Sequence, residues 1–230
     1  MENISVEKLR ELIYRKRSGE RVLDLKKRGL SNVPGAVYDL TELKELDLSG
    51  NYLKELPTNI NKLKNLKELR LSENQLRELP HSICELSNLT VLSVMRNQLS
   101  LLPSNIKHLK NLQRLNLKDN QVTTLPDEIG ELKELVSLDV SNNKLTVLSS
   151  HIKHLSRLRV LDLSDNQLTT LPDEIGELKE LVLLSGAGNP LTLEGMRKVV
   201  KLQNKMKFDK DVTGKDVECS LFVLYFMSCE

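Results

Sequence analysis

Asparagine recurs at one fixed interval of 23 residues along this chain, and each copy is set in the same frame of leucines. So strict a period indicates a chain built from stacked copies of one small unit, none of which can bury its apolar side chains alone. Stacked units form long open surfaces and rarely enclose catalytic pockets. The repeated asparagines are Asn51, Asn74, Asn97, Asn120, Asn143, Asn166 and Asn189.

The unit reads Leu-x-x-Leu-x-x-Leu-x-Leu-x-x-Asn-x-Leu-x-x-Leu-Pro-x-x-Ile-x-x, as in residues 40–62. The alternation of Leu46 and Leu48 predicts a short strand with both leucines facing the core. Strands of successive coils would stack into a parallel sheet that lines the concave side of an arc. The asparagine has donors and acceptors for the backbone of its own and a neighbouring coil. We therefore predict an α/β solenoid of about eight coils held together by a structural asparagine ladder.

The repeat degenerates at both ends of the chain. Arg28 stands where the first asparagine is expected, and Val6, Leu9, Leu12 and Ile13 follow Ser5, a suitable N-cap, at helical spacing. This pattern predicts a capping helix over residues 1–16 and repeats over residues 17–191. A second apolar stripe, Leu193, Met196, Val199, Val200 and Leu202, predicts a carboxy-terminal capping helix over residues 192–208. Residues 209–230 are interpreted as a loose linker followed by an apolar tail.

One pair of segments is identical in sequence. Thr123 to Val136 is repeated as Thr169 to Val182, 46 residues further on. A duplication of two coils explains this identity simply. It indicates that the loops on the convex side were copied as scaffold and not adjusted one by one to a partner.

The repeat pattern resembles the intracellular Ras-group type of leucine-rich repeat, found in Ras-pathway scaffold and Ras suppressor proteins and in Erbin and Scribble. The resemblance covers roughly residues 17–200. It implies a non-catalytic scaffold or adaptor that binds a signalling protein, such as a small GTPase or a phosphatase, on its concave face. Larger relatives add kinase, GTPase, PDZ or death domains. The alternative is therefore a recognition fragment of a larger enzyme or receptor, with an effector domain lost after residue 208.

The residues between the leucines hold the candidate binding site. A cluster of cationic side chains surrounds an exposed methionine in the middle coils, and arginine and methionine are frequent at interface centres. We predict a partner-binding patch, suited to an acidic surface, formed by Arg70, Met95, Arg96, Arg114 and Lys118. In the alternative interpretation these are solvated strand residues that pair with Glu73 or Asp119.

Composition narrows the class of protein further. The net charge of +2 gives no indication of nucleic-acid or membrane-surface binding. The amino terminus has no apolar core of a secretory signal, and no run reaches the roughly 18 apolar residues of a membrane-spanning helix. Three cysteines at no repeating position indicate a reducing compartment, so we expect a cytoplasmic location. We also expect the protein to be a monomer. Arg15 to Arg17 and Lys26 to Arg28 are basic triplets, interpreted as solvated faces, with nuclear import or acidic-lipid binding as alternatives.

No motif for catalysis or cofactor binding is found. The four histidines, His81, His108, His151 and His154, have no cysteine or carboxylate partners at zinc-ligand spacing. Gly214-Lys215 lacks the leading glycine and following serine or threonine of a phosphate-binding loop. Cys84, at a convex position, is interpreted as an exposed, ordinary thiol. The sequence predicts a protein without enzymatic activity, metal or cofactor.

Overall fold

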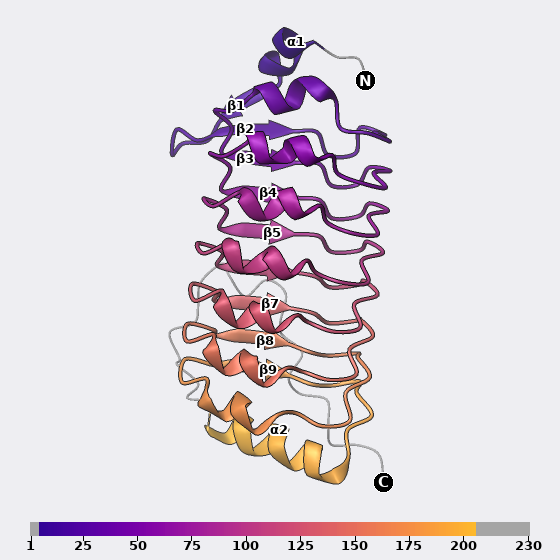
Figure 1. The fold of residues 1–230 in the computed structure, drawn as a ribbon, viewed down its shortest axis with the longest axis vertical. Helices are drawn as coiled ribbons and strands as arrows, with labels where there is room; N and C mark the ends of the chain where they lie inside the picture. The colour runs from indigo at the N-terminus through magenta and orange to yellow at the C-terminus, as the bar shows by residue number, and fades with distance from the viewer. Residues whose placement is uncertain (1–4, 206–230) are drawn as a thin grey trace.

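The computed structural model describes residues 5–205, which form an elongated stack of coils with a helix near each end. One sheet runs the length of the stack, and its strands follow one another in chain order (Figure 1). The strands are β1 Ile13–Arg15, β2 Arg21–Asp24, β3 Glu45–Asp47, β4 Glu68–Arg70, β5 Val91–Ser93, β6 Arg114–Asn116, β7 Ser137–Asp139, β8 Val160–Asp162 and β9 Leu183–Ser185. From β2 to β9 every pairing is parallel, one strand for each of the eight predicted coils.

The register of the sheet follows directly from the repeat. Leu46 pairs with Leu69, and Leu69 pairs with Leu92, so that equivalent leucines stack through the core. These three side chains are at most 1% exposed. Because a full ladder of leucines is buried only between neighbouring coils, the core is continuous along the stack and not divided into domains.

The chain returns on the other side of the coil through short 3-10 helices, which lie in front of the sheet in Figure 1. A proline precedes most of them, as Pro57 does with φ −70° and ψ 154°, and Ile60 then points into the core with no exposed surface. These helices are η1 Gly35–Asp39, η2 Thr58–Lys62, η3 His81–Glu85, η4 Ser104–His108, η5 Asp127–Glu131, η6 Ser150–His154 and η7 Asp173–Glu177. The sequence predicted only extended or turn geometry for this segment.

The amino-terminal end differs in part from the sequence-based expectation. A helix is present, α1 Val6–Glu11, and Ser5 Oγ accepts a hydrogen bond from the Lys8 N–H at 3.3 Å. The chain then leaves the helix and adds β1 antiparallel to β2, with Tyr14 opposite Val22. A helix that continues to residue 16 was therefore too long, because Leu12 caps the end of α1 and Ile13 begins the β1–β2 hairpin.

The carboxy-terminal helix, α2 Leu193–Lys205, covers the last coil. Val199 and Gly195 pack against that coil, and Leu202 is partly buried beside them. The remainder of the predicted stripe points away, because Leu193, Met196 and Val200 are 76%, 48% and 55% exposed. The predicted linker and apolar tail, residues 209–230, lie outside the described residues, as do the final residues of the predicted capping helix.

Candidate functional site: the concave face

The outer face of the parallel sheet carries the candidate site. Residues that alternate with the buried leucines point to this face, because successive side chains of a strand point to opposite sides. The positions between the two strand leucines form a central column that runs from coil to coil in register. The column contains Asp24, Asp47, Arg70, Ser93, Asn116, Asp139, Asp162 and Ser185.

All four aspartates of the central column, and Asn116, close the turn that follows their own strand. Asp47 Oδ1 accepts the Ser49 N–H at 2.9 Å, and Asn116 Oδ1 accepts the Lys118 N–H at 3.0 Å. Asp139 accepts both the backbone N–H and the hydroxyl of Ser141. These aspartates therefore have a local structural role, and their spacing alone does not identify a ligand site.

The turns themselves hold a second series of side chains at the rim of the concave face. The residue before each asparagine of the ladder has a positive φ, for example 57° at Glu73, 53° at Arg96 and 55° at Asp119. This backbone places equivalent side chains side by side in successive coils. Arg96 is 3.3 Å from Glu73 on one side and 3.3 Å from Asp119 on the other. Glu73, Arg96 and Asp119 therefore form an ionic chain across three coils.

The five residues of the predicted patch lie on β4 to β6 and the turns that follow these strands. Met95 is half-buried, and Lys118 occupies the equivalent position in the next coil. Arg114 is exposed and lies in register between Val91 and Ser137. The structure thus places the five residues in one region of the concave face. Their electrostatic surroundings differ from residue to residue.

Arg70 and Arg96 are paired with carboxylates of this chain. Arg96 belongs to the ionic chain at the rim, and Arg70 contacts Glu68 and lies 3.6 Å from Glu45. Glu45 is only 2% exposed and is held from its other side by Lys16 at 2.5 Å. The pairing of Arg96 with Glu73 and Asp119 is the one that the alternative interpretation anticipated. The contribution of Lys16 was missed, because nothing in the repeat pattern places the β1–β2 hairpin next to the second coil.

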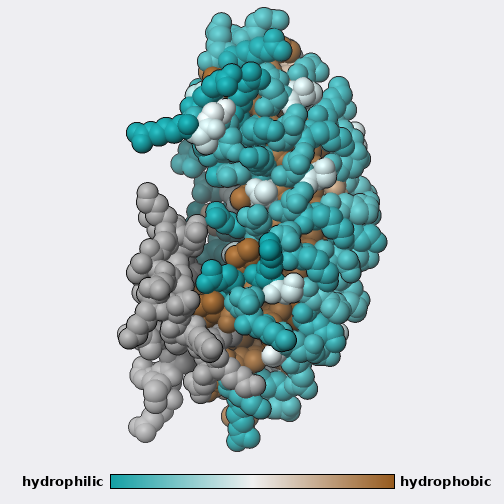
Figure 2. Space-filling model, turned by 90° about the vertical axis from the view of Figure 1, so that its left-hand side faces the viewer, coloured by the Kyte–Doolittle hydropathy of each residue, from teal (hydrophilic) through white to brown (hydrophobic). Residues whose placement is uncertain are grey.

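The composition of the concave side changes along the stack. Towards the carboxy terminus its residues become apolar, and Val136, Val160, Val182 and Leu183 are half-buried. Figure 2 shows apolar side chains gathered in the lower part of the molecule, whereas the upper coils are mostly hydrophilic. A partner that lies along the stack would therefore meet charged side chains first and apolar ones later.

The asparagine ladder lies beside this face and is fully bonded. Asn120 Nδ2 donates to Leu117 O of its own coil at 2.9 Å and to Val94 O of the preceding coil at 3.0 Å. Its Oδ1 accepts the Leu99 N–H at 3.0 Å. A second, exposed series was not predicted: Asn65, Asn88 and Asn111 each donate to a carbonyl of the preceding coil. Both series join coils and leave no amide directed at a ligand.

Residues 5–205 show no candidate metal site. No group of three or more histidines, cysteines, aspartates or glutamates within this range could hold a metal ion. His151 Nδ1 lies 3.3 Å from an Asp127 carboxylate oxygen, and both side chains are exposed. No helix of the described part is long and apolar enough to cross a membrane.

Cys84 differs from its predicted state. The side chain is 1% exposed, and burial raises the pKa of its thiol to about 11, with a smaller contribution from Glu85. The residue lies in η3. The longer side chains of Asn61 and Lys107 stay partly exposed at the equivalent positions, whereas a short side chain becomes covered.

Comparison with known families agrees with this architecture. A family model described as a leucine-rich repeat region matches residues 19–118, and a second, described as leucine rich repeat, matches residues 100–145 and 133–191. The chain belongs to the leucine-rich repeat family. Domains of this family are in general protein-binding modules and typically non-catalytic. The comparison with curated proteins gives no significant match.

Solved structures show the same fold in proteins of several kinds. A leucine-rich repeat protein of Leptospira interrogans is 32% identical with a TM-score of 0.65, and the match covers 79% of this chain and 58% of that one. The plant peptide hormone receptor RGFR1, solved in complex with RGF2, is 32% identical with a TM-score of 0.65, covering 78% and 33%. An internalin of Listeria monocytogenes, at 23% identity and a TM-score of 0.71, covers 80% and 52% and shows the fold alone. The chain therefore spans between a third and just over half of these proteins.

Proposed function

We propose that the chain is a non-catalytic adaptor of intracellular signalling that binds a partner protein on the concave face of β4 to β6. The observation that carries the proposal is the position of Met95. This half-buried, flexible apolar side chain lies in the turn after β5, half-way along the stack, and the cation Lys118 occupies the equivalent position in the next coil. Arg114 belongs to that same coil and lies on β6, opposite Val91 of β5. A large apolar side chain among cations is the composition found at the centre of many interfaces.

Arg70 and Arg96 are held by carboxylates of this chain. Arg70 and Arg96 would have to exchange their carboxylate partners for those of a ligand, which offsets much of the energy gained. We define the centre of the proposed patch as Met95 with Lys118 and Arg114 of the following coil, and its border as Arg70 and Arg96.

The nature of the partner and the compartment rest on the resemblance to Ras-group repeats. On that basis we propose a small GTPase or a phosphatase-type signalling protein as partner, a cytoplasmic location and a monomeric state. Cys84 is a free thiol, which fits a reducing compartment.

The test is a comparison of two charge-reversed proteins in affinity purification followed by mass spectrometry. Arg114→Glu with Lys118→Glu changes the proposed centre. Lys54→Glu with Arg77→Glu makes the same change in charge at exposed positions outside the sheet. We expect the amount of captured partner to fall at least about tenfold with the first double variant and to stay unchanged with the second. Equal capture by both would sink the proposal.

A second candidate function is supported by the comparisons. In this reading the chain is the recognition part of a larger receptor or enzyme. The neighbours include plant receptors at about a third identity, and this chain spans 33% of RGFR1. The exposed apolar face of α2, formed by Leu193, Met196 and Val200, is a surface on which further structure could pack. An immunoblot of the native protein that shows a mass well above 26.2 kDa, with a reading frame that continues past Glu230, would favour this candidate.

A further inference from the structure

The excess positive charge of the molecule is confined to its amino-terminal end. Residues 5–28 hold nine lysines and arginines against four acidic residues, whereas residues 29–205 hold 22 of each. Only part of this excess is neutralised locally, by the pairs Lys16–Glu45 and Arg21–Glu42. The described chain therefore owes its net positive charge to its first coil and the residues before it.

A hollow of about 550 Å³ lies at this end, and its lining is mixed in character. One wall is Leu12 and Tyr14, where the chain enters β1. Tyr14 is opposite Val22 in the sheet and therefore points to the concave side, together with Asp24. The other wall is the turn after β2, which contributes Asp24, Lys26, Lys27 and Arg28.

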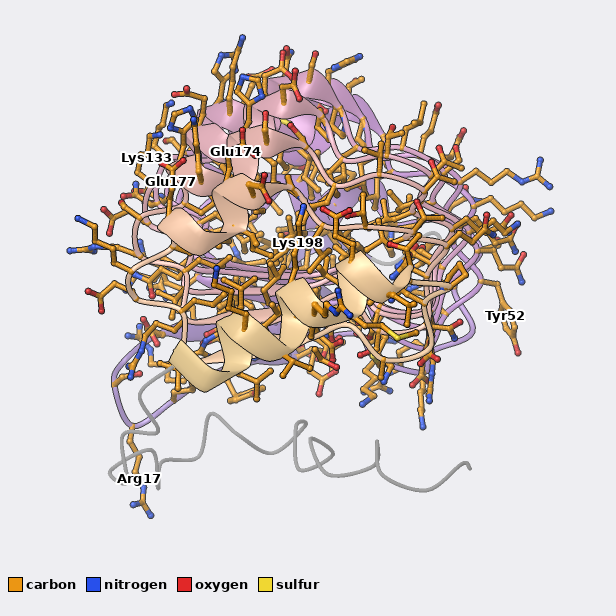
Figure 3. All side chains as sticks on the ribbon, turned by 90° about the horizontal axis from the view of Figure 1, so that it is seen from below. Arg17, Tyr52, Lys133, Glu174, Glu177 and Lys198 are labelled. Atoms are coloured by element: carbon orange, nitrogen blue, oxygen red, sulfur yellow. The ribbon has the colours of Figure 1, made fainter. Side chains whose placement is uncertain are left out.

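Three of these lining side chains are unpaired cations. Within residues 5–205, Lys26, Lys27 and Arg28 form no ion pair with a carboxylate. The stem of Lys27 is held in place, because it lies over Gly50 so closely that an added Cβ there would be 2.7 Å from Lys27 Cγ. Arg17, at the turn of the β1–β2 hairpin, extends clear of the body in Figure 3 at the other end of β2 and is not part of the hollow. The situation of the three lining cations is opposite to that of Arg70 and Arg96, which are already paired.

The backbone of this turn determines what kind of anion fits. The Lys26 N–H donates to Asp24 Oδ1 at 2.8 Å, the Lys27 N–H to Ser49 O at 2.9 Å, and the Arg28 N–H to Asn51 Oδ1 at 3.0 Å. No N–H of these three residues remains for a phosphate, so the turn is not a backbone cradle of the kind that binds phosphate groups. Recognition must come from long side chains and from the apolar wall.

We propose that this hollow binds an acidic peptide segment of the partner protein, with an apolar side chain of that segment against Leu12 and Tyr14. Glutamate or aspartate side chains of the segment pair with Lys26, Lys27 and Arg28. The inference rests on the proposed function, since it places part of the same partner at the end of the concave face. It also moves the acidic contact from the paired arginines of the middle coils to the unpaired cations of the first coil. An anionic membrane is the less suitable occupant, because a flat bilayer surface would not reach into a hollow on the concave side.

The experiment uses the full chain and a defined probe, a fluorescein-labelled peptide Gly-Glu-Glu-Leu-Glu-Glu-Gly, followed by fluorescence anisotropy. The control peptide has glutamine in place of each glutamate. We expect weak binding of the acidic peptide and at least about tenfold weaker binding of the glutamine peptide, because the attraction is between opposite charges.

Two variants with equal changes in charge locate the site. Lys26→Glu with Arg28→Glu reverses the charge of the hollow. Lys179→Glu with Arg197→Glu reverses the charge of two exposed cations near the other end of the stack. We expect the first to weaken binding about tenfold or more and the second less than about twofold, at an ionic strength where distant charges are screened. Circular dichroism and thermal unfolding establish that both variants are folded.

Absence of binding by the native chain, or equal weakening in both variants, overturns the inference. Sedimentation with phosphatidylserine vesicles that depends on Lys26 and Arg28, without peptide binding, overturns it in favour of a membrane. Failure here is distinguishable from failure of the proposed function. If partner capture depends on Arg114 and Lys118 but not on Lys26 and Arg28, the proposed adaptor function stands and the hollow is not part of the interface. If the hollow binds the peptide but no partner is captured through Arg114 and Lys118, the proposed adaptor function is contradicted.

Discussion

Lys16 Nζ lies 2.5 Å from Glu45 Oε1, and this pair fastens the amino-terminal hairpin to the second coil. Glu45 is almost fully buried, so loss of Lys16 would leave a carboxylate with Arg70 as its nearest cation at 3.6 Å. We expect Lys16→Met to destabilise the protein by about 1–2 kcal/mol, a value reduced from that of a buried pair because solvent reaches Lys16. Urea unfolding measures this difference, and a double variant with Glu45→Gln should recover part of it.

The same pair gives a pH dependence. The hydrogen bond to Glu45 raises the pKa of Lys16 above its ordinary value. Because the folded-state pKa is raised, the stabilisation is complete below the ordinary lysine value of about 10.4 and is lost as pH rises through the folded-state value. Native and Lys16→Met proteins should therefore differ in unfolding free energy at pH 8 and converge in strongly alkaline solution. A constant difference across this range would contradict the assignment.

The two asparagine series should differ in their contribution to stability. Asn120→Ala leaves Val94 O, Leu117 O and the Leu99 N–H without their partner in a buried place. We expect a loss of about 1–3 kcal/mol. Asn111→Ala removes one hydrogen bond to Ser87 O at an exposed site, where water replaces it, and should cost below about 1 kcal/mol. Chemical denaturation of both variants compares them, and equal losses would contradict a structural role specific to the buried ladder.

The leucine and asparagine spacing was sufficient to predict the coils and the parallel sheet, because these features depend on repeated burial that every coil shares. The helix near each end was predicted from apolar stripes outside the repeat. The features that these patterns did not predict depend on single residues. Leu12 and Ile13 satisfy helical spacing and strand alternation equally well over so short a stretch, and contact with β2 decides between them. Glu73 and Arg96 are not residues that favour a positive φ, and the hydrogen bonds of the ladder impose it on them.

The position of the candidate site could be predicted from the sequence, but the ion pairs of its residues could not. The repeat is enough to put Arg70, Met95 and Arg114 on the concave side. It does not show the contact of Arg70 with Glu45, because Glu45 becomes its neighbour only through the register of β3 and β4. Glu68, the other partner of Arg70, lies two residues before it on the same face of β4. The hollow at the first coil was missed for a related reason. In the sequence, the basic triplet Lys26 to Arg28 looks like an ordinary solvated segment. Only the fold of the hairpin, which places Tyr14 across the hollow from the triplet, reveals the site.

Asp139 offers a stabilising substitution. Burial raises the pKa of Asp139, and repulsion from Asp162 adds to this effect, while hydrogen bonds from Ser141 oppose it. Asn116 shows that an amide closes the same turn. We expect Asp139→Asn to increase stability by up to about 1 kcal/mol at neutral pH.

The gain from Asp139→Asn should depend on pH in a defined direction. A raised folded-state pKa of an acid means that the penalty is complete above that value and disappears as the folded protein takes up a proton on acidification. The gain should thus vanish below about pH 4, the ordinary range of aspartate. Asp47→Asn is the control, because Asp47 has Arg70 in register and should give no gain. A gain in both variants, or one that persists in acid, would count against this explanation.

Cys84 should be protected from reagents until the protein unfolds. In a protein with Cys219→Ser and Cys229→Ser, labelling at pH 8 with a thiol-reactive dye reports on Cys84 alone. Since burial raises the pKa of its thiol to about 11, we expect labelling to be at least about 100-fold slower in the native protein than in urea. Similar rates in both states would show that the side chain is accessible.

The identical segments Thr123–Val136 and Thr169–Val182 place Gly130 and Gly176 in the same sequence but in different surroundings. A Cβ at Gly130 would lie 2.5 Å from the backbone oxygen of His151, because η5 packs closely under η6. At Gly176 the nearest atom would be Leu202 Cδ2 at 3.6 Å, an ordinary contact with α2. We expect Gly130→Ala to cost about 1–3 kcal/mol through overpacking.

Gly176→Ala should instead be neutral or stabilise the protein by up to about 1 kcal/mol, since alanine restricts the unfolded chain and no backbone atom opposes it. Urea unfolding of the two variants provides the comparison, with each acting as the control for the other. Because the local sequences are identical, a difference can arise only from the neighbouring coil or from α2. Equal changes would mean that the close approach of His151 to Gly130 relaxes without cost, and that the duplicated convex loops are interchangeable in energy as well as in sequence.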